Sequence, residues 1–140
     1  MKKIFLAALL VVSVAGFAQT KQQDVKNLLA ALQIKPTMQN MVHTGVNLFK
    51  SKKPAVPQQV WNDIENLVDY TPYLNTVTAI FNNNYTQTEL KHLTMLATKA
   101  KAGKQPKFKP SVKTALYNAG NDFGKQLANL INTQLMTKGY

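Results

Sequence analysis

The residues best suited to metal binding are few and widely spaced. The candidates are two histidines and three of the six acidic residues: His43, His92, Asp63, Glu65 and Asp69. Neither histidine has a second histidine or an acid three or four residues further on, which is the spacing that places two ligands on one helix face. Glu65 and Asp69 do share a face, but such a pair is typical of a solvated surface. We therefore expect no metal site and no cofactor.

Residues for nucleophilic or acid–base catalysis are equally sparse. The chain has no cysteine, and its two serines after residue 18, Ser51 and Ser111, lie outside any Gly-x-Ser-x-Gly setting. No glycine-rich phosphate loop is present. Paired carboxylates would require the fold to gather acids that are distant in sequence, with Asp63, Glu65, Asp69, Glu89 and Asp122 as candidates. We predict no catalytic residues and a protein that is not an enzyme, with a hydrolase of this gathered kind as the lowest-ranked alternative.

Lysine dominates the charge of the chain. All seventeen basic residues are lysines, and six acids leave a formal net charge of +11. A basic loop is formed by Lys99, Lys101, Lys104, Lys107, Lys109 and Lys113. It could contact an anionic lipid or an acidic glycan, or it could be a solvated helix end in a lysine-rich composition. Nucleic acid is an unlikely partner, because stacking aromatic residues are scarce near these lysines and arginine forks are absent.

The strongest local signal is a helix start at residues 85–90. Thr86 is placed to accept a hydrogen bond from the Glu89 backbone, and the Glu89 carboxylate can reach back to the Thr86 N–H, which together make a capping box. Tyr85 and Leu90 occupy the two positions of a hydrophobic staple. The apolar face then continues through Leu93, Leu96, Ala97 and Ala100. Met95 points away from this face, and we expect it to make a second contact, inside a bundle in preference to toward a partner.

The pattern along the rest of the chain predicts about six helices and no strand. The expected helix starts are Asp24, Thr37, Pro57, Thr71, Thr86 and Pro110. Lys35 precedes Pro36 and is expected to end the first helix. The fifth helix should end near Gly103, and the last and longest should run to about Met136. The predicted fold class is a single all-α domain, a helical bundle with a long C-terminal helix.

Apolar spacing predicts which positions face inward in each helix. In the second and third helices these are Met38, Met41, Val42, Leu48, Phe49, Val60, Trp61, Ile64, Leu67 and Val68. Gly45 lies on the same stripe, where it indicates close helix packing. Gly120 and Gly124 each cost about 1 kcal/mol relative to alanine inside a helix, so we expect close packing there too, against an internal helix or another subunit.

Residues 1–18 have the features of a secretory signal peptide. Lys2 and Lys3 form a basic start, an apolar run follows from Ile4 to Val14, and small residues precede a cleavage site near Ala18/Gln19. The apolar run is too short to span a membrane. We expect residues 19–140 to form one exported domain, periplasmic or secreted, with no transmembrane span.

The order of several short motifs resembles a bacterial exported family, the domain of unknown function family 2059. The motifs are Pro57 with Trp61, Asp69-Tyr70, Tyr85-Thr86-Gln87-Thr88-Glu89-Leu90, Gly103-Lys104, Pro110, and Ala119-Gly120-Asn121-Asp122-Phe123-Gly124. The similarity covers roughly residues 56–130. The chain departs from the family at Thr98–Gly103, where the family usually has Ser/Thr-Pro-x-Gly. The resemblance implies an exported helical domain and brings no catalytic residues.

These observations together favour an exported, non-catalytic binding or envelope-associated module. Its expected partner is an envelope protein or an anionic envelope component. The alternative function is peripheral binding of anionic lipid or glycan through the loop from Lys99 to Lys113.

Overall fold

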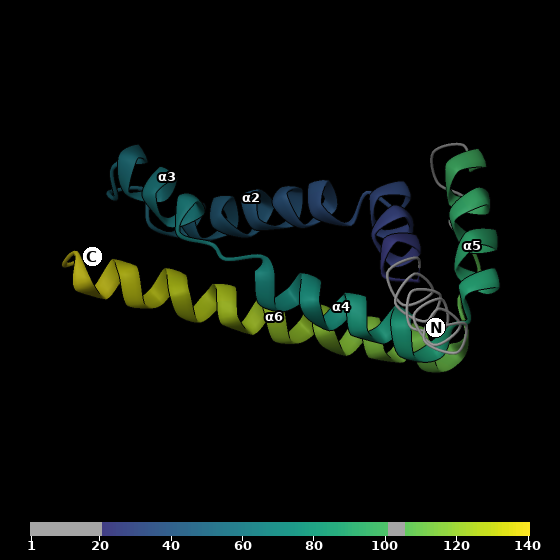
Figure 1. The fold of residues 1–140 in the computed structure, drawn as a ribbon. Coiled ribbons are helices and arrows are strands. Elements are labelled where there is room, and N and C mark those ends of the chain that lie inside the picture. The colour runs from purple at the N-terminus through teal and green to yellow at the C-terminus, as the bar shows by residue number, and fades with distance from the viewer. Residues whose placement is uncertain (1–20, 101–105) are drawn as a thin grey trace, which may run out of the picture. The chain divides into compact units, whose positions relative to one another are not determined.

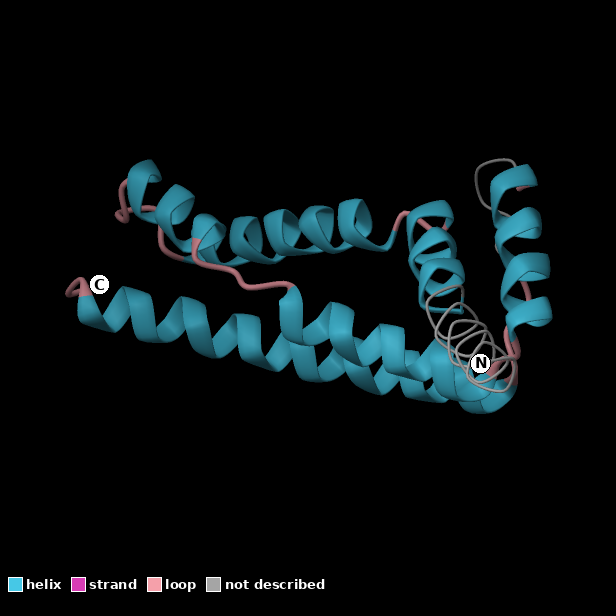
Figure 2. Ribbon diagram, viewed as in Figure 1, coloured by secondary structure: helices cyan, strands magenta, loops and turns pink. Residues whose placement is uncertain are grey.

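The computed structural model describes residues 21–100 and 106–140, and all regular structure in those residues is helical (Figures 1 and 2). A helix over residues 21–31 is followed by α2 (Ile34–Lys52), α3 (Gln58–Asn66), α4 (Thr71–Asn84), α5 (Gln87–Lys99) and α6 (Pro110–Thr137). The predicted all-α fold of about six helices with a long C-terminal helix is confirmed. The signal peptide predicted over residues 1–18 lies outside the described residues. Within the described part of the chain, none of the helices is both long enough and apolar enough to cross a membrane.

Contacts divide the chain into two compact units. The described part of the first unit comprises residues 21–32, 78–100 and 106–108. The second unit comprises Gln33–Val77 and Lys109–Tyr140. α4 is divided between them after Val77, so that each unit contains part of this helix.

In the first unit, α5 begins with the predicted capping box. The Thr86 N–H donates to Glu89 Oε2 over 2.7 Å, and the Glu89 N–H donates to Thr86 Oγ1 over 3.3 Å. Tyr85 and Leu90 are both buried on either side of this box, as a hydrophobic staple requires. The helix ends at Lys99, and Gly103, where its end was expected, lies outside the described residues.

Aromatic rings form much of the first unit's core. The Phe81 ring centroid lies 6.0 Å from that of Tyr85 and 5.4 Å from that of Phe108. Val25 and Leu28 of the first helix are fully buried. On α5 the predicted inward face is wrong at Leu96, which is 38% exposed. The expectation that Met95 makes a second contact inside the bundle is also wrong, because this side chain is 42% exposed.

The boundary between the first helix and α2 differs from the prediction. Residue 21 is already helical, so Asp24 is a buried position inside the helix and not its cap. The chain turns at Gln33, whose φ of 53° is left-handed, and α2 begins before Lys35. Pro36 does not break α2 because the first N–H groups of a helix have no intrahelical partner. The Thr37 N–H donates to the Gln33 carbonyl over 3.0 Å, so the helical hydrogen-bond pattern continues directly after Pro36.

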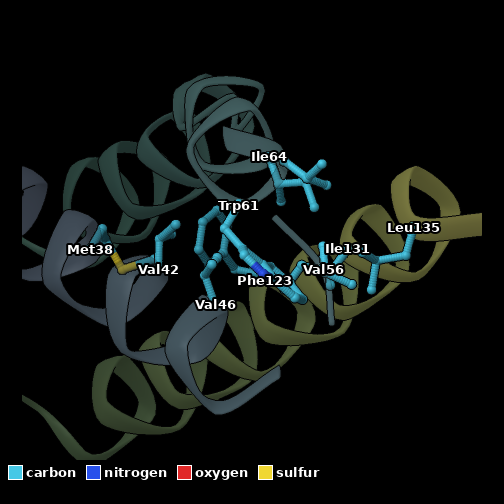
Figure 3. Packing of buried hydrophobic residues seen from close by; sticks show 10 residues of the cluster. Met38, Val42, Val46, Val56, Trp61, Ile64, Phe123, Ile131 and Leu135 are labelled. Atoms are coloured by element: carbon cyan, nitrogen blue, oxygen red, sulfur yellow. The ribbon is translucent and has the colours of Figure 1, made fainter. Parts of the chain in front are cut away.

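The second unit's core is made by α2, α3, α6 and the α2–α3 connection. Figure 3 shows Trp61 in the middle of this core, among side chains from α2 and α6. Its buried members are Met38, Val42, Val46, Val56, Val60, Trp61, Ile64, Phe123, Ile131 and Leu135. The inward prediction is wrong at three leucine or methionine positions, because Met41, Leu48 and Leu67 are 52%, 61% and 53% exposed. On α2, the part of the apolar stripe that its neighbours bury is narrower than the whole stripe.

Glycine positions differ sharply in how close their neighbours lie. A Cβ at Gly45 of α2 would come within 3.1 Å of Leu127 Cδ2 on α6, so the prediction of close packing there is confirmed. A Cβ at Gly120 or Gly124 would meet no described heavy atom within 4 Å. The prediction that an internal helix packs closely on Gly120 and Gly124 is therefore wrong for the described residues. The open side of α6 at these positions leaves the second possibility, another subunit, as an expectation.

Candidate binding groove

The structure joins two of the predicted metal-ligand candidates across a helix pair. His43 of α2 and Glu65 of α3 lie 3.0 Å apart, from Nδ1 to Oε1, with side chains that are 65% and 31% exposed. Burial raises the pKa of the nearby Tyr70 phenol, and the negative charge of Glu65 raises it further. No group of three histidine, cysteine or acidic side chains in the described residues could hold a metal ion. His92 is exposed elsewhere, on α5.

Three of the five acids proposed for a gathered site take part in separate interactions. Asp63 faces Lys138 at 3.7 Å, and Glu65 pairs with His43. Glu89 caps α5 in the other unit. Asp69 and Asp122 remain, and both line neighbouring hollows in the surface of the second unit.

Four of the six lysines of the predicted basic loop fall within the described residues. Lys99 ends α5, Lys107 lies in the following connection, Lys109 is the N-cap of α6, and Lys113 lies in the first turns of α6. Lys101 and Lys104 lie outside the described residues. The described lysines belong to both units, and each unit presents its own pair.

The two hollows of the second unit form one surface depression, here named the α4–α6 groove. The hollow beside the first turns of α4 has a volume of about 140 Å³, and the hollow beside the end of α3 has about 250 Å³. Both are lined by Pro72, Phe123 and Gln126, which makes them continuous. One wall is a face of α6 formed by Ala119, Asp122, Phe123, Gln126, Leu127 and Leu130. The other contains Leu67, Val68, Asp69, Pro72, Tyr73 and Thr76.

One wall of the groove follows a single face of α6. The lining positions from Ala119 to Leu130 recur every three or four residues, which keeps them on one face of the helix. At 1.5 Å per residue this face is about 16 Å long. Phe123 lies at its centre, with its ring centroid 6.1 Å from Tyr70 and 5.4 Å from Tyr73. Burial raises the pKa of the Tyr73 phenol further above its usual value near 10, so this side chain is uncharged at physiological pH.

Two carboxylates give the groove its charge. The Asp69 carboxylate accepts a hydrogen bond of 2.9 Å from the Thr71 N–H at the start of α4. This bond, together with one from the Thr71 hydroxyl, lowers the pKa of Asp69 and keeps the carboxylate ionised. Asp122 lies 3.8 Å from Lys125, with both side chains at least 70% exposed, so this pair neutralises it only weakly. The groove therefore combines an apolar centre with anionic edges.

Sequence spacing gave no direct signal for the groove. Pro72 and Phe123 are distant in the chain and meet only in the fold. Leu67 was predicted to face the core. It is instead 53% exposed and lines the groove. An exposed leucine next to Asp69 and Pro72 is the feature that could have suggested a binding surface.

A third hollow runs along α2 and includes Met41, Gly45 and Leu48. All of its lining residues lie on this one helix, so it is an open helix face and not an enclosed site. No charged side chain lines it. It offers apolar contact without the polar groups that orient a ligand.

Comparison of the chain with protein-family models, with curated proteins and with solved structures finds no match, so its function has to be inferred from the geometry described above.

Proposed function

We propose that the protein is an exported, non-catalytic binding module and that the α4–α6 groove is its binding site. The observation that carries the proposal is the continuous groove, which leaves apolar side chains open beside the packed core of the second unit. Leu67 alone keeps 53% of its surface exposed there. A partner that covers it removes apolar surface from water, and full burial of one leucine side chain contributes about 1.5 to 3 kcal/mol.

Support for a defined site comes from the rigid surroundings of the groove. Phe123 is 7% exposed and belongs to the same buried cluster as Trp61. Asp69 is held by the first turn of α4 through its hydrogen bond with Thr71. Binding to side chains that are already fixed costs less conformational entropy than binding to mobile ones.

The test compares two leucines of similar exposure. Leu67→Glu places a charge in the groove, and Leu48→Glu places the same charge on the exposed face of α2. Wild type, L67E and L48E are immobilised and incubated with a detergent-treated bacterial envelope extract. We expect a species that wild type and L48E retain and L67E loses. Equal recovery by all three proteins would contradict the proposed site.

Export is proposed on the leader-like pattern of residues 1–18 and on the resemblance of residues 56–130 to the exported family. Expression of the full chain in a bacterial host, followed by intact mass measurement of the periplasmic and medium fractions, tests it. We expect a product that begins at Gln19. A full-length chain that remains in the cytoplasm would count against export.

A second candidate function is supported by the charges at the start of α6. Lys109 and Lys113 lie at the positive end of the helix dipole, and the first turn contains no acid. An anionic lipid or glycan would be attracted by both the dipole and the lysines. Co-sedimentation with anionic vesicles should therefore decrease with salt and with K109Q/K113Q. Binding that is unchanged between low and high salt would exclude this function.

A further inference from the structure

We infer that the α4–α6 groove binds an extended peptide segment in which lysine or arginine alternates with large apolar residues. The inference rests on the proposed function and adds the chemistry of the partner. Three properties of the groove point to it: its length, the positions of its charges, and an amide at its centre.

The length of the groove favours a chain over a compact small molecule. The lining face of α6 extends for about 16 Å, which an extended peptide spans with about five residues at 3.3 Å each. Side chains of an extended segment point alternately to opposite sides. Apolar residues at every second position would therefore face Phe123, Leu127 and Leu130, while the residues between them reach the edges of the groove.

The charges of the groove select cationic side chains for those edges. In the second unit, Asp63 faces Lys138 and Glu65 faces His43. Asp69 and Asp122 line the groove, and the exposed contact of Asp122 with Lys125 screens its charge only weakly. The Asp69 carboxylate is fixed by the Thr71 N–H. The whole chain carries a net charge of +11, so an anionic groove is a local exception to its overall field. A basic partner would be attracted to this groove and repelled from most other surfaces of the protein.

Gln126 supports a peptide in preference to an aliphatic lipid chain. Its side chain lines both hollows, midway along the groove. An amide side chain both donates and accepts hydrogen bonds, which matches the N–H and C=O groups of an extended backbone. A hydrocarbon chain would leave this amide without a partner in a covered groove, and that costs binding free energy.

The experiment uses the full chain, labelled with nitrogen-15, and three seven-residue peptides with blocked ends. The first alternates lysine and leucine, the second glutamate and leucine, and the third glutamine and leucine. We expect the lysine peptide to shift the amide resonances of Leu67, Phe123 and Gln126. The glutamate peptide should leave these resonances in place, although it can bind the lysine-rich surfaces elsewhere.

Two double variants, each of which removes two negative charges, test the role of the groove carboxylates. The second variant is the matched control for the first. D69N/D122N removes the carboxylates of the groove, and D63N/E65Q removes two that lie outside it. We expect D69N/D122N to weaken binding of the lysine peptide about fivefold, the effect of two exposed ion pairs, and D63N/E65Q to change it less than twofold. The affinity for wild type should also fall as salt is added.

The inference is overturned if the glutamate or glutamine peptide shifts the groove resonances as strongly as the lysine peptide, or if both double variants weaken binding equally. It is also overturned if an anionic or neutral lipid vesicle displaces these resonances while no peptide does. These failures are distinct from failure of the proposed function, because selective loss of an envelope species by L67E would still identify the groove as the binding site.

Discussion

Replacement of Gly120 and Gly124 by alanine is expected to stabilise the protein, although glycines four residues apart in a helix usually suggest tight packing. Both lie inside α6, and a Cβ at either position meets no described atom within 4 Å. Glycine is less favourable than alanine in a helix interior by about 1 kcal/mol, largely because the unfolded chain loses more freedom on folding. Each substitution should therefore raise the free energy of unfolding by about 1 kcal/mol and the Tm by about 4 °C.

Gly45 provides the matched comparison for these two positions. The same substitution there places a methyl group 3.1 Å from Leu127 Cδ2, so the leucine must move by a few tenths of an ångström. The cost of this displacement offsets much of the helix-propensity gain, and we expect G45A to change stability by less than about 0.5 kcal/mol. G45V adds two further methyl groups at the same contact and should destabilise by about 1 to 3 kcal/mol.

Urea unfolding followed by circular dichroism at 222 nm measures these effects, with the midpoint and slope fitted for each variant. The comparison should be repeated at two protein concentrations tenfold apart. Destabilisation of more than about 0.5 kcal/mol by G120A or G124A would refute the reasoning. If that destabilisation depends on protein concentration, the glycines pack against a second copy of the chain, since only association is affected by mass action.

Three further predictions concern single interactions. Thr86→Ala removes half of the capping box and should lower the free energy of unfolding by about 1 kcal/mol, measured by urea unfolding, with Thr86→Ser close to wild type. Phe123→Ala should cost about 3 to 5 kcal/mol and shift the fluorescence of the neighbouring core tryptophan, and a cost below about 1 kcal/mol would contradict its central place in the core. Because the folded-state pKa of Asp69 is lowered, its contribution to stability is present above pH 3.8 and is lost as the pH falls through the lower folded value. Asp69→Asn should therefore flatten the acid side of the stability–pH profile, and an unchanged profile would show that this carboxylate is not linked to folding.

Local sequence patterns predicted those features whose partners lie within about five residues of each other. The capping box joins residues three apart, and the Tyr85 and Leu90 staple joins residues five apart, so their geometry follows from the backbone of a helix start. The Pro110 start of the long helix was predicted for the same reason, because proline suits the first turn. At Pro36 a different rule, that the residue before a proline avoids helical geometry, gave the wrong boundary. The proline was read as a helix end, whereas it lies in the first turn of α2.

Long-range pairings could not be predicted because they depend on which helix faces pack together. His43 and Glu65 are on different helices, and nothing in their local spacing indicates the 3.0 Å contact. The apolar stripe of α2 is wider than the surface that its neighbours cover, so the stripe alone wrongly placed Met41 and Leu48 inside. The groove has the same origin, since its walls come from separate parts of the chain that meet beside Phe123.

The way the chain alternates between the two units has a consequence for synthesis. The chain passes from the first unit to the second after Leu32, returns at Thr78, and leaves again after Phe108. The ribosome therefore makes α2 and α3 of the second unit before the first unit can be completed. At about 5 to 20 residues per second, synthesis of this intervening stretch takes roughly 2 to 9 seconds. Neither unit corresponds to a continuous stretch of sequence, so a truncated or stalled product would hold parts of both units. The core of each unit can therefore form completely only after the second of its two chain segments has been synthesised.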